Sequence, residues 1–145
     1  MHARPEGQMD ARTERRSVSS GSPWEPVVGY SRALRTGPFV HVSGTTAVDR
    51  EGRVLSPGDP RGQTLHVLRK IREALEACGA RLEDVVRTRI YVVDIDRWEE
   101  VGRAHGEVFG EIRPATSMVE VRRLIAPGLL VEIEADAWIE NPEGR

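Results

Sequence analysis

Few side chains in this sequence stand in the patterns that catalysis or metal binding requires. The histidines have no ligand-like spacing and no paired cysteines accompany them, which argues against a zinc site. The histidines are His2, His41, His66 and His105. The chain also lacks a phosphate-cradling glycine loop and the Gly-x-Ser-x-Gly turn that exposes a nucleophilic serine. We therefore expect no metal, and ordinary acids and bases remain as candidates for any chemistry.

His105 has the most informative surroundings of the four histidines. It lies within an apolar helical stripe that runs from Trp98 to Ile112. A histidine in such a stripe is usually a partly buried side chain whose hydrogen bonds are satisfied. The alternative is a donor or proton carrier that lines a cleft. The sole cysteine, Cys78, ends the stripe of the preceding helix and is expected to be a small buried hydrophobe.

Two helices are predicted to position these residues. The first begins at Asp59 and Pro60, because an aspartate accepts hydrogen bonds from free N–H groups and a proline loses nothing there. Gly79 ends it as a left-handed cap. The second helix is expected to begin at Asp96, with Glu99 three residues later completing a capping box.

Runs of β-branched and aromatic residues predict five strands around these helices. The strands are 27–35, 39–43, 85–93, 117–124 and 130–139. The resulting order, ββ-α-β-α-ββ, predicts an α+β fold with a mixed sheet and both helices packed on one face.

The other face of the sheet is predicted to mix charged residues with apolar and aromatic ones. Its predicted residues are Arg87, Arg89, Tyr91, Met118, Glu120, Arg122, Glu132, Glu134 and Asp136. A second copy of the same chain would suit such a mixture, which predicts self-association. A half-solvated antiparallel face is the alternative.

Length and composition bound the class of protein. The 145 residues fit one domain, and we place it at 24–145, after a flexible N-terminal arm at 1–23 that lacks apolar periodicity. An arm that docks on a partner subunit is the alternative. The net charge of −2 argues against a nucleic-acid partner. No apolar run approaches the ~20 residues that span a membrane, and the single cysteine favours a cytoplasmic location.

Several segments resemble the RidA (YjgF) family in their order and spacing, from about Val27 to about Ile139. They are Gly29-Tyr30-Ser31-Arg32-Ala33, Val42-Ser43-Gly44, Gln63, Ala77-Cys78-Gly79-Ala80, Leu82-Glu83-Asp84-Val85-Val86, Tyr91-Val92-Val93-Asp94, Pro114-Ala115, Val119-Glu120-Val121 and Val131-Glu132-Ile133-Glu134-Ala135. The resemblance implies a chorismate-mutase-like α+β fold and a homotrimer with ligand clefts between subunits. It also implies hydrolysis of reactive imines and enamines to ammonia and a 2-oxo acid, without a cofactor or metal.

Carried over residue by residue, the resemblance assigns roles to this chain's own side chains. Glu132 matches the family's cleft glutamate, which positions water, and is our candidate general acid and base. Tyr30 matches a cleft-lining tyrosine, and Ser43-Gly44 matches the cleft wall. Met118 stands where a cysteine is often seen, and His105 where a tyrosine is frequent.

Thr116 is the main departure from the family's pattern. Active members carry an arginine directly after Pro-Ala, where its planar guanidinium clamps a substrate carboxylate, and this chain has Thr116 there. Either the substrate has changed, another arginine has taken over, or the imine activity is lost. Arg32 and Arg122 are the candidate substitutes, and Arg122 shares a face with Thr116 if their strand is regular. For both, a surface or interface ion pair is the alternative.

Three functions follow from these observations. The first is a homotrimeric hydrolase or deaminase of small imines, enamines or related acids. The second is a binding or regulatory protein of the same fold that holds a small metabolite without turnover. The third, ribonuclease or translation-inhibitor activity, is disfavoured by the acidic net charge and by the lack of a basic groove studded with aromatic residues.

Overall fold

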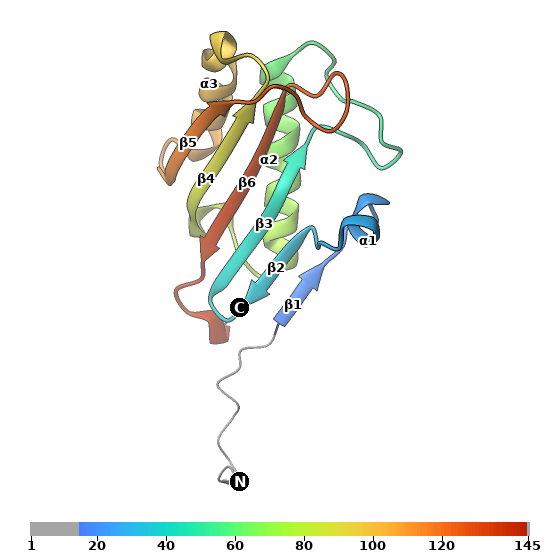
Figure 1. The fold of residues 1–145 in the computed structure, drawn as a ribbon. Coiled ribbons are helices and arrows are strands. Elements are labelled where there is room, and N and C mark those ends of the chain that lie inside the picture. Colours follow the sequence, from blue (N-terminus) through green and yellow to red (C-terminus); the bar gives the residue numbers. More distant parts are fainter. Residues whose placement is uncertain (1–14, 145) are drawn as a thin grey trace, which may run out of the picture.

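The computed structural model describes residues 15–144 and shows one sheet backed by two long helices (Figure 1). The strands are β1 (Arg15–Val18), β2 (Ala33–Thr36), β3 (Phe39–Thr46), β4 (Val85–Val92), β5 (Ala115–Glu120) and β6 (Val131–Trp138). The helices are α1 (Trp24–Val28), α2 (Pro60–Ala77) and α3 (Trp98–Phe109), with single turns η1 (Leu82–Asp84), η2 (Ile95–Arg97) and η3 (Pro142–Gly144).

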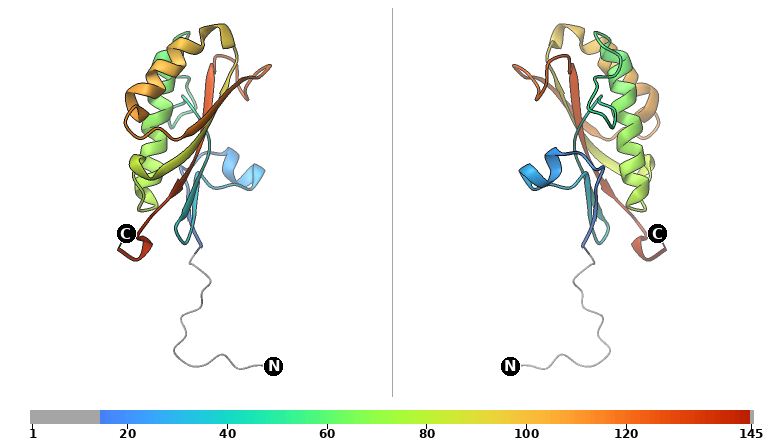
Figure 2. Two further views of the ribbon diagram at one scale, coloured as in Figure 1. Left: turned by 90° about the vertical axis from the view of Figure 1, so that its left-hand side faces the viewer. Right: turned by 90° about the vertical axis from the view of Figure 1, so that its right-hand side faces the viewer.

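The six strands lie in the order β1-β2-β3-β6-β4-β5. Only β4 and β5 run parallel, and every other neighbouring pair is antiparallel. Helices α2 and α3 both cover the same face, while the short α1 lies on the opposite side (Figure 2). The predicted α+β class, the mixed sheet and the placement of two helices on one face are confirmed.

The core lies between this sheet face and the helices. Alternate residues of β6, from Val131 to Ala137, are buried, and they meet Val67, Leu68 and Ile71 of α2. The intervening β6 positions point to the opposite face, which α2 and α3 leave uncovered, and they remain partly exposed. We call this the uncovered face. The strand's period of two therefore separates the core from a polar surface, as its sequence predicts.

Helix α2 begins and ends as its sequence indicates. The Asp59 carboxylate accepts a hydrogen bond from the Gly62 amide at 2.9 Å, and Pro60 occupies the first helical position. Gly79 follows the helix with φ of 79°, the left-handed conformation that glycine adopts without strain. Cys78 is fully buried, as expected.

The predicted start of the second helix is wrong by a few residues. Asp94, not Asp96, provides the side-chain cap, since its carboxylate accepts from the Asp96 amide at 3.0 Å and opens the turn η2. Helix α3 then begins at Trp98 with no side-chain cap at Arg97. A short 3-10 turn relayed into a helix satisfies the same free N–H groups that a capping box would.

The flexible arm predicted at 1–23 is wrong for its last part. Residues 15–18 form β1, which pairs antiparallel with β2, and Arg16 donates to the Ala77 carbonyl at 2.7 Å. An edge strand held by backbone hydrogen bonds needs no apolar periodicity, so its sequence gives little sign of it. The predicted strand at 27–35 is likewise α1 followed by the shorter β2. Residues 1–14 of the predicted arm lie outside the described residues.

Among residues 15–144, no helix is long and apolar enough to cross a membrane.

Candidate functional site

A bulge in β3 places two of the predicted site residues. The pairing of β3 with β6 shifts register between Val42 and Thr45, so Ser43 and Gly44 bulge from the ladder. The Ser43 hydroxyl donates to the Ser31 carbonyl at 2.6 Å, and the Thr45 hydroxyl donates to the Ser43 carbonyl at 2.8 Å. These bonds join the bulge to the segment that precedes β2.

Glu132 lies directly against this bulge. A Cβ atom at Gly44 would stand 2.9 Å from the Glu132 carboxyl carbon, so only glycine admits the carboxyl group in its present position. Burial raises the pKa of Glu132 above its ordinary value, and the nearby charge of Arg32 opposes that rise only in part. A half-buried carboxyl group with a raised pKa takes up a proton more readily than an ordinary carboxylate, which suits it to accept and return a proton.

Arg32 is the cationic partner in this cluster. Its guanidinium donates to the Gly44 carbonyl and lies 5.8 Å from the centre of the Tyr30 ring, a cation–π distance. Its Nε atom is buried without a hydrogen-bond partner. An unpartnered buried N–H is costly, and a bound acceptor would relieve that cost. We call Tyr30, Arg32, Ser43, Gly44 and Glu132 the Glu132 half-site.

Sequence reasoning missed Lys70, which stands close to this half-site. It is the only lysine in the chain, beside 20 arginines among the 21 basic residues. Its Nζ atom donates to the Thr46 carbonyl at 2.6 Å and to the Val48 carbonyl at 3.2 Å. Burial, with repulsion from Arg32, lowers the pKa of Lys70 to about 8. The use of a lone lysine among so many arginines was the available sequence signal.

A second group of predicted residues gathers between β5 and α3. The Thr116 hydroxyl lies 2.8 Å from the Thr88 hydroxyl, which lies 2.9 Å from Nε2 of His105. The Thr116 hydroxyl also lies 3.2 Å from the Pro114 carbonyl oxygen, which can accept its hydrogen. Thr88 is fully buried and Thr116 is exposed, so the three side chains form a hydrogen-bonded chain from the interior to the surface. Thr88 was also missed by sequence reasoning, because a threonine in a strand is ordinary.

His105 closes the inner end of that chain. Its ring packs on Phe109 with centroids 4.7 Å apart, and burial lowers its pKa below the ordinary value. The side chain is partly buried and hydrogen-bonded, as the first interpretation expects. Its link through Thr88 to the exposed Thr116 hydroxyl is also compatible with the second interpretation, a donor or proton carrier.

Met118 lies beside this chain, against the helix. A Cβ atom at Gly102 would lie 4.0 Å from the Met118 methyl group and 3.5 Å from the Trp98 ring. The predicted assignment of Met118 to the uncovered sheet face is wrong. β5 pairs in parallel with β4, opposing Met118 to the buried Ile90, so both point toward the helices. We call Thr88, Gly102, His105, Thr116 and Met118 the Thr116 half-site.

Arg122 does not join Thr116, because β5 ends at Glu120 and the regular alternation stops there. Glu120 shares the Met118 face and accepts a hydrogen bond from the Ile95 amide at 3.2 Å, a contact that ties β5 to η2. Of the two candidate substitutes for the missing clamp, Arg32 alone lies in a half-site.

The two half-sites do not meet within one chain. Glu132 points to the uncovered face, whereas Thr116 points to the helix side of an edge strand. Across residues 15–144, no hydrogen bond or ion pair joins a member of one half-site to a member of the other.

The uncovered face carries an ion-pair network beside the Glu132 half-site. Asp136 bonds His41 at 2.8 Å and Arg89 at 3.0 Å, while the Tyr91 hydroxyl donates to Glu134 at 2.9 Å. Phe39 and Trp138 stack edge to face at the rim with centroids 4.6 Å apart, and both are about half exposed. The face is thus polar at its centre and aromatic at its rim.

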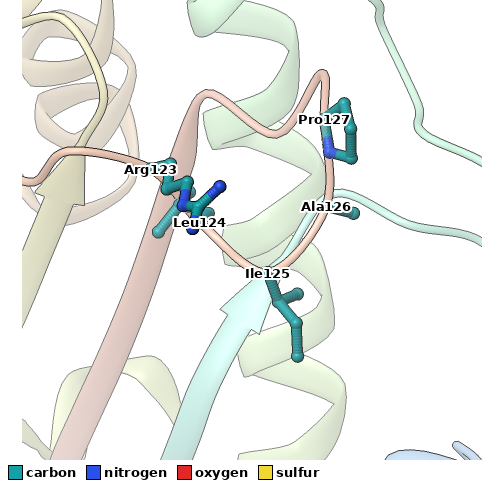
Figure 3. Close-up of a pocket in the computed structure, with 5 residues that line it drawn as sticks. All are labelled: Arg123, Leu124, Ile125, Ala126 and Pro127. Atoms are coloured by element: carbon teal, nitrogen blue, oxygen red, sulfur yellow. The ribbon is translucent and has the colours of Figure 1, made fainter.

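The loop after β5 encloses an open hollow of about 600 Å³ (Figure 3). Its lining is a single run of loop residues, 123–127, and Ile125 is 65% exposed. No residue of either half-site lines it, so it carries no part of the candidate chemistry.

Comparison with known proteins agrees with this architecture. Residues 21–139 match the family described as Endoribonuclease L-PSP. A protein of Streptomyces coelicolor, SCO2049, is 38% identical over 123 residues, covering 85% of this chain and 91% of that one. The RutC family protein PYRAB12510 of Pyrococcus abyssi is 37% identical over 116 residues, covering 80% and 91%.

Solved structures show the same fold. The crystal structure of Rv2704 from Mycobacterium tuberculosis, a member of the YjgF/YER057c/UK114 family, is 60% identical with a TM-score of 0.80, covering 87% of this chain and all of that one. The YjgF protein of E. coli is 28% identical with a TM-score of 0.73, covering 85% and 98%. The chain described here belongs to the YjgF/RidA family, whose shared domain is the Endoribonuclease L-PSP domain.

Proposed function

We propose that this protein is a homotrimer that binds a small metabolite in clefts between subunits and hydrolyses an imine or enamine there. The observation that carries the proposal is the Glu132 carboxyl group, which is half-buried against Gly44, beside Arg32, with a raised pKa. A carboxyl group held in this way is suited to proton transfer during addition of water. The separation of the two half-sites within one chain supports a cleft completed by a neighbouring copy.

The proposed reaction adds water to the imine carbon. Glu132 takes a proton from the water as the new C–O bond forms and passes it to the nitrogen, which gives a carbinolamine. The hydroxyl proton of the carbinolamine then moves through Glu132 to the nitrogen as the C=O bond forms and the C–N bond breaks. Ammonia leaves and a 2-oxo acid remains, so no oxidant or reductant is required. The Arg32 guanidinium, the positive charge beside Glu132, is the proposed partner of a substrate carboxylate.

The test is ammonia release from 2-aminoacrylate generated in place by a dehydratase. We expect Glu132→Gln to abolish the acceleration that the wild-type protein gives, because glutamine keeps the shape but cannot take a proton. Glu134→Gln is the matched control, since Glu134 lies on the same face but bonds Tyr91 instead. Equal rates for wild type and Glu132→Gln would refute the catalytic proposal, and a protein that is not trimeric by light scattering would refute the cleft.

A binding or regulatory protein of the same fold is the second candidate, and Thr116 favours it. The resemblance implies an arginine at this position in active family members, whereas the threonine of this chain supplies no charge. Thr116→Arg separates the two candidates. If only that variant releases ammonia, the cleft is competent and the natural ligand is a different molecule.

Ribonuclease activity, which the domain's name suggests, is the weakest candidate. The net charge is −2, and Arg89 on the uncovered face is paired with Glu134 and Asp136 instead of lining a basic groove. RNA binding that collapses with added salt would revive it.

A further inference from the structure

The Thr116 hydroxyl has one hydrogen and two candidate internal acceptors. It can donate to the Pro114 carbonyl at 3.2 Å or to the Thr88 hydroxyl at 2.8 Å. Which of them it uses depends on the direction of hydrogen bonding along the chain that ends at His105.

Whichever way the hydrogen bonds run between Thr116 and His105, the Thr116 oxygen keeps a free lone pair. If His105 donates from Nε2, Thr88 must donate to Thr116, and Thr116 then gives its hydrogen to Pro114. If Nε2 accepts, Thr88 donates to His105 and Thr116 donates to Thr88. In either case the hydrogen of Thr116 is already used internally, and at least one lone pair of its oxygen is free.

We infer that the Thr116 half-site binds the hydrogen-bond-donating end of a ligand, an amine, amide or hydroxyl group, and does not bind a carboxylate. A donor adds a bond to Thr116 without breaking one. An acceptor must first take that hydrogen from the Pro114 carbonyl or from Thr88, and either group then loses a hydrogen bond. The loss costs most at Thr88, which is fully buried.

The residues beside Thr116 favour the same class of ligand. Thr116, Met118 and Glu120 point the same way along β5, so a ligand laid on this row would meet an acceptor, an apolar side chain and a carboxylate. Arg87 and Arg89 oppose Ala115 and Ser117, which point to the other face. A carboxylate on this row would lack a cationic partner from β4 or β5, whereas an ammonium group would have favourable partners.

The Trp98 ring adds an aromatic surface to the row. It is 53% exposed, and a Cβ at Gly102 would lie 3.5 Å from it and 4.0 Å from the Met118 methyl group. The absence of a side chain at Gly102 leaves this ring face open toward Met118. Aromatic faces attract amines and ammonium groups and repel carboxylates.

This inference rests on the proposed function for the existence of a cleft, and it fixes how a ligand would be oriented there. The nitrogen end would lie at Thr116 and any carboxylate at Arg32, which belongs to the other half-site. A ligand with its carboxylate at Thr116 would have the reverse orientation.

The test uses the full-length protein with ¹³C-labelled threonine and methionine methyl groups. Propylammonium, propanamide and propanoate are titrated separately, and the Thr116 and Met118 methyl signals are followed. We expect saturable shifts of both signals with propylammonium and propanamide, and none with propanoate. Thr116→Val, which keeps the shape and removes the oxygen, should weaken propylammonium binding about tenfold, the loss of one charge-assisted hydrogen bond. Ser117→Val, on the opposite face of β5, should leave it unchanged.

Saturable propanoate shifts at Thr116 that exceed those of propylammonium would overturn the inference. An unchanged propylammonium affinity in Thr116→Val, or the absence of shifts with all three compounds, would also overturn it. The proposed function fails separately, through loss of the trimer or through ammonia release that does not depend on Glu132. A trimer that hydrolyses 2-aminoacrylate yet binds propanoate at Thr116 would keep the function and refute the orientation.

Discussion

The two half-sites differ in charge and in how they are held. The Glu132 half-site brings a carboxyl group and a guanidinium together at a backbone bulge, with Lys70 nearby, and burial shifts the pKa of all three. The Thr116 half-site contains hydroxyl groups and a neutral imidazole, joined by a hydrogen-bonded chain. The groups suited to proton transfer and anion binding therefore lie in the first, while the second offers shape and neutral hydrogen-bonding groups.

Among changes that keep Glu132 itself, the largest expected effect comes from Gly44→Ala, which would disrupt the Glu132 half-site. The added methyl group would stand 2.9 Å from the Glu132 carboxyl carbon. The carboxyl group is the far end of a flexible side chain, so it should move aside at little cost in stability. Misplacement of a catalytic group by about 1 Å can cost on the order of 100-fold in rate. We expect a fall of that size in ammonia release.

Gly106→Ala is the matched control for this substitution. Nothing lies within 4 Å of a Cβ at Gly106, which is exposed on α3. The change should raise the free energy of unfolding by about 0.5–1 kcal/mol, because alanine loses less entropy in a helix. Ammonia release should not change. An equal loss of rate in both variants would show that Gly44 has no special relation to Glu132.

Thr88→Val should disrupt the Thr116 half-site and lower the free energy of unfolding. Thr88 is fully buried and bonds both His105 and Thr116. Its removal leaves a partly buried imidazole nitrogen without a partner, at a cost of about 1–3 kcal/mol in the free energy of unfolding. Thr116→Val, at the exposed end of the chain, should cost less, about 0.5–1.5 kcal/mol, because only one hydrogen bond is lost and Thr88 keeps its bond to His105. Urea denaturation measures the free energy of unfolding of both variants. Similar losses would mean that Thr88 is no better shielded from water than Thr116.

The difference between local and long-range contacts also explains which features of the fold the sequence predicts. The helix starting at Pro60, the alternation of β6 and the α+β class follow from local capping and periodicity, and they were predictable. Strand β1 was not, because an edge strand is held by backbone bonds that leave no side-chain pattern.

The candidate site was predictable only in part, for a similar reason. The side of β5 on which Met118 lies depends on its parallel pairing with β4, which its own sequence does not encode. The Glu132 half-site could be assigned by resemblance, but the hydrogen-bonded chain from Thr116 through Thr88 to His105 depends on three elements that meet only in space.

His105 sharpens the comparison through pH. Burial lowers its pKa below the ordinary value, so the unfolded chain binds the proton more readily than the folded one. The stability contributed by neutral His105 is therefore fully present above its ordinary pKa of about 6.5, and it declines as the pH falls below that. We expect His105→Gln to flatten the pH dependence of the unfolding free energy between about 7 and 5. An unchanged slope would show that His105 protonates equally in both states.

The smallest expected effect concerns Lys70, which reports on the Glu132 half-site without disturbing it. As the only lysine, it gives a single Nζ signal in a labelled sample. Its pKa is lowered to about 8, first by burial and then by repulsion from Arg32. The unfolded chain holds that proton more tightly, so stability should rise with pH above about 8, until the lysine of the unfolded chain also loses its proton near about 10.4.

Arg32→Gln should raise the midpoint of the Lys70 titration, because it removes the stronger repulsive charge. Arg69→Gln, which removes a weaker repulsion from the same helix, should raise it less. Both midpoints can be followed by NMR of the lysine side chain. If Arg32→Gln leaves the midpoint where it was, the charge of Arg32 does not act on Lys70. The two cations would then be separate features of the chain, and Lys70 would not belong with the Glu132 half-site.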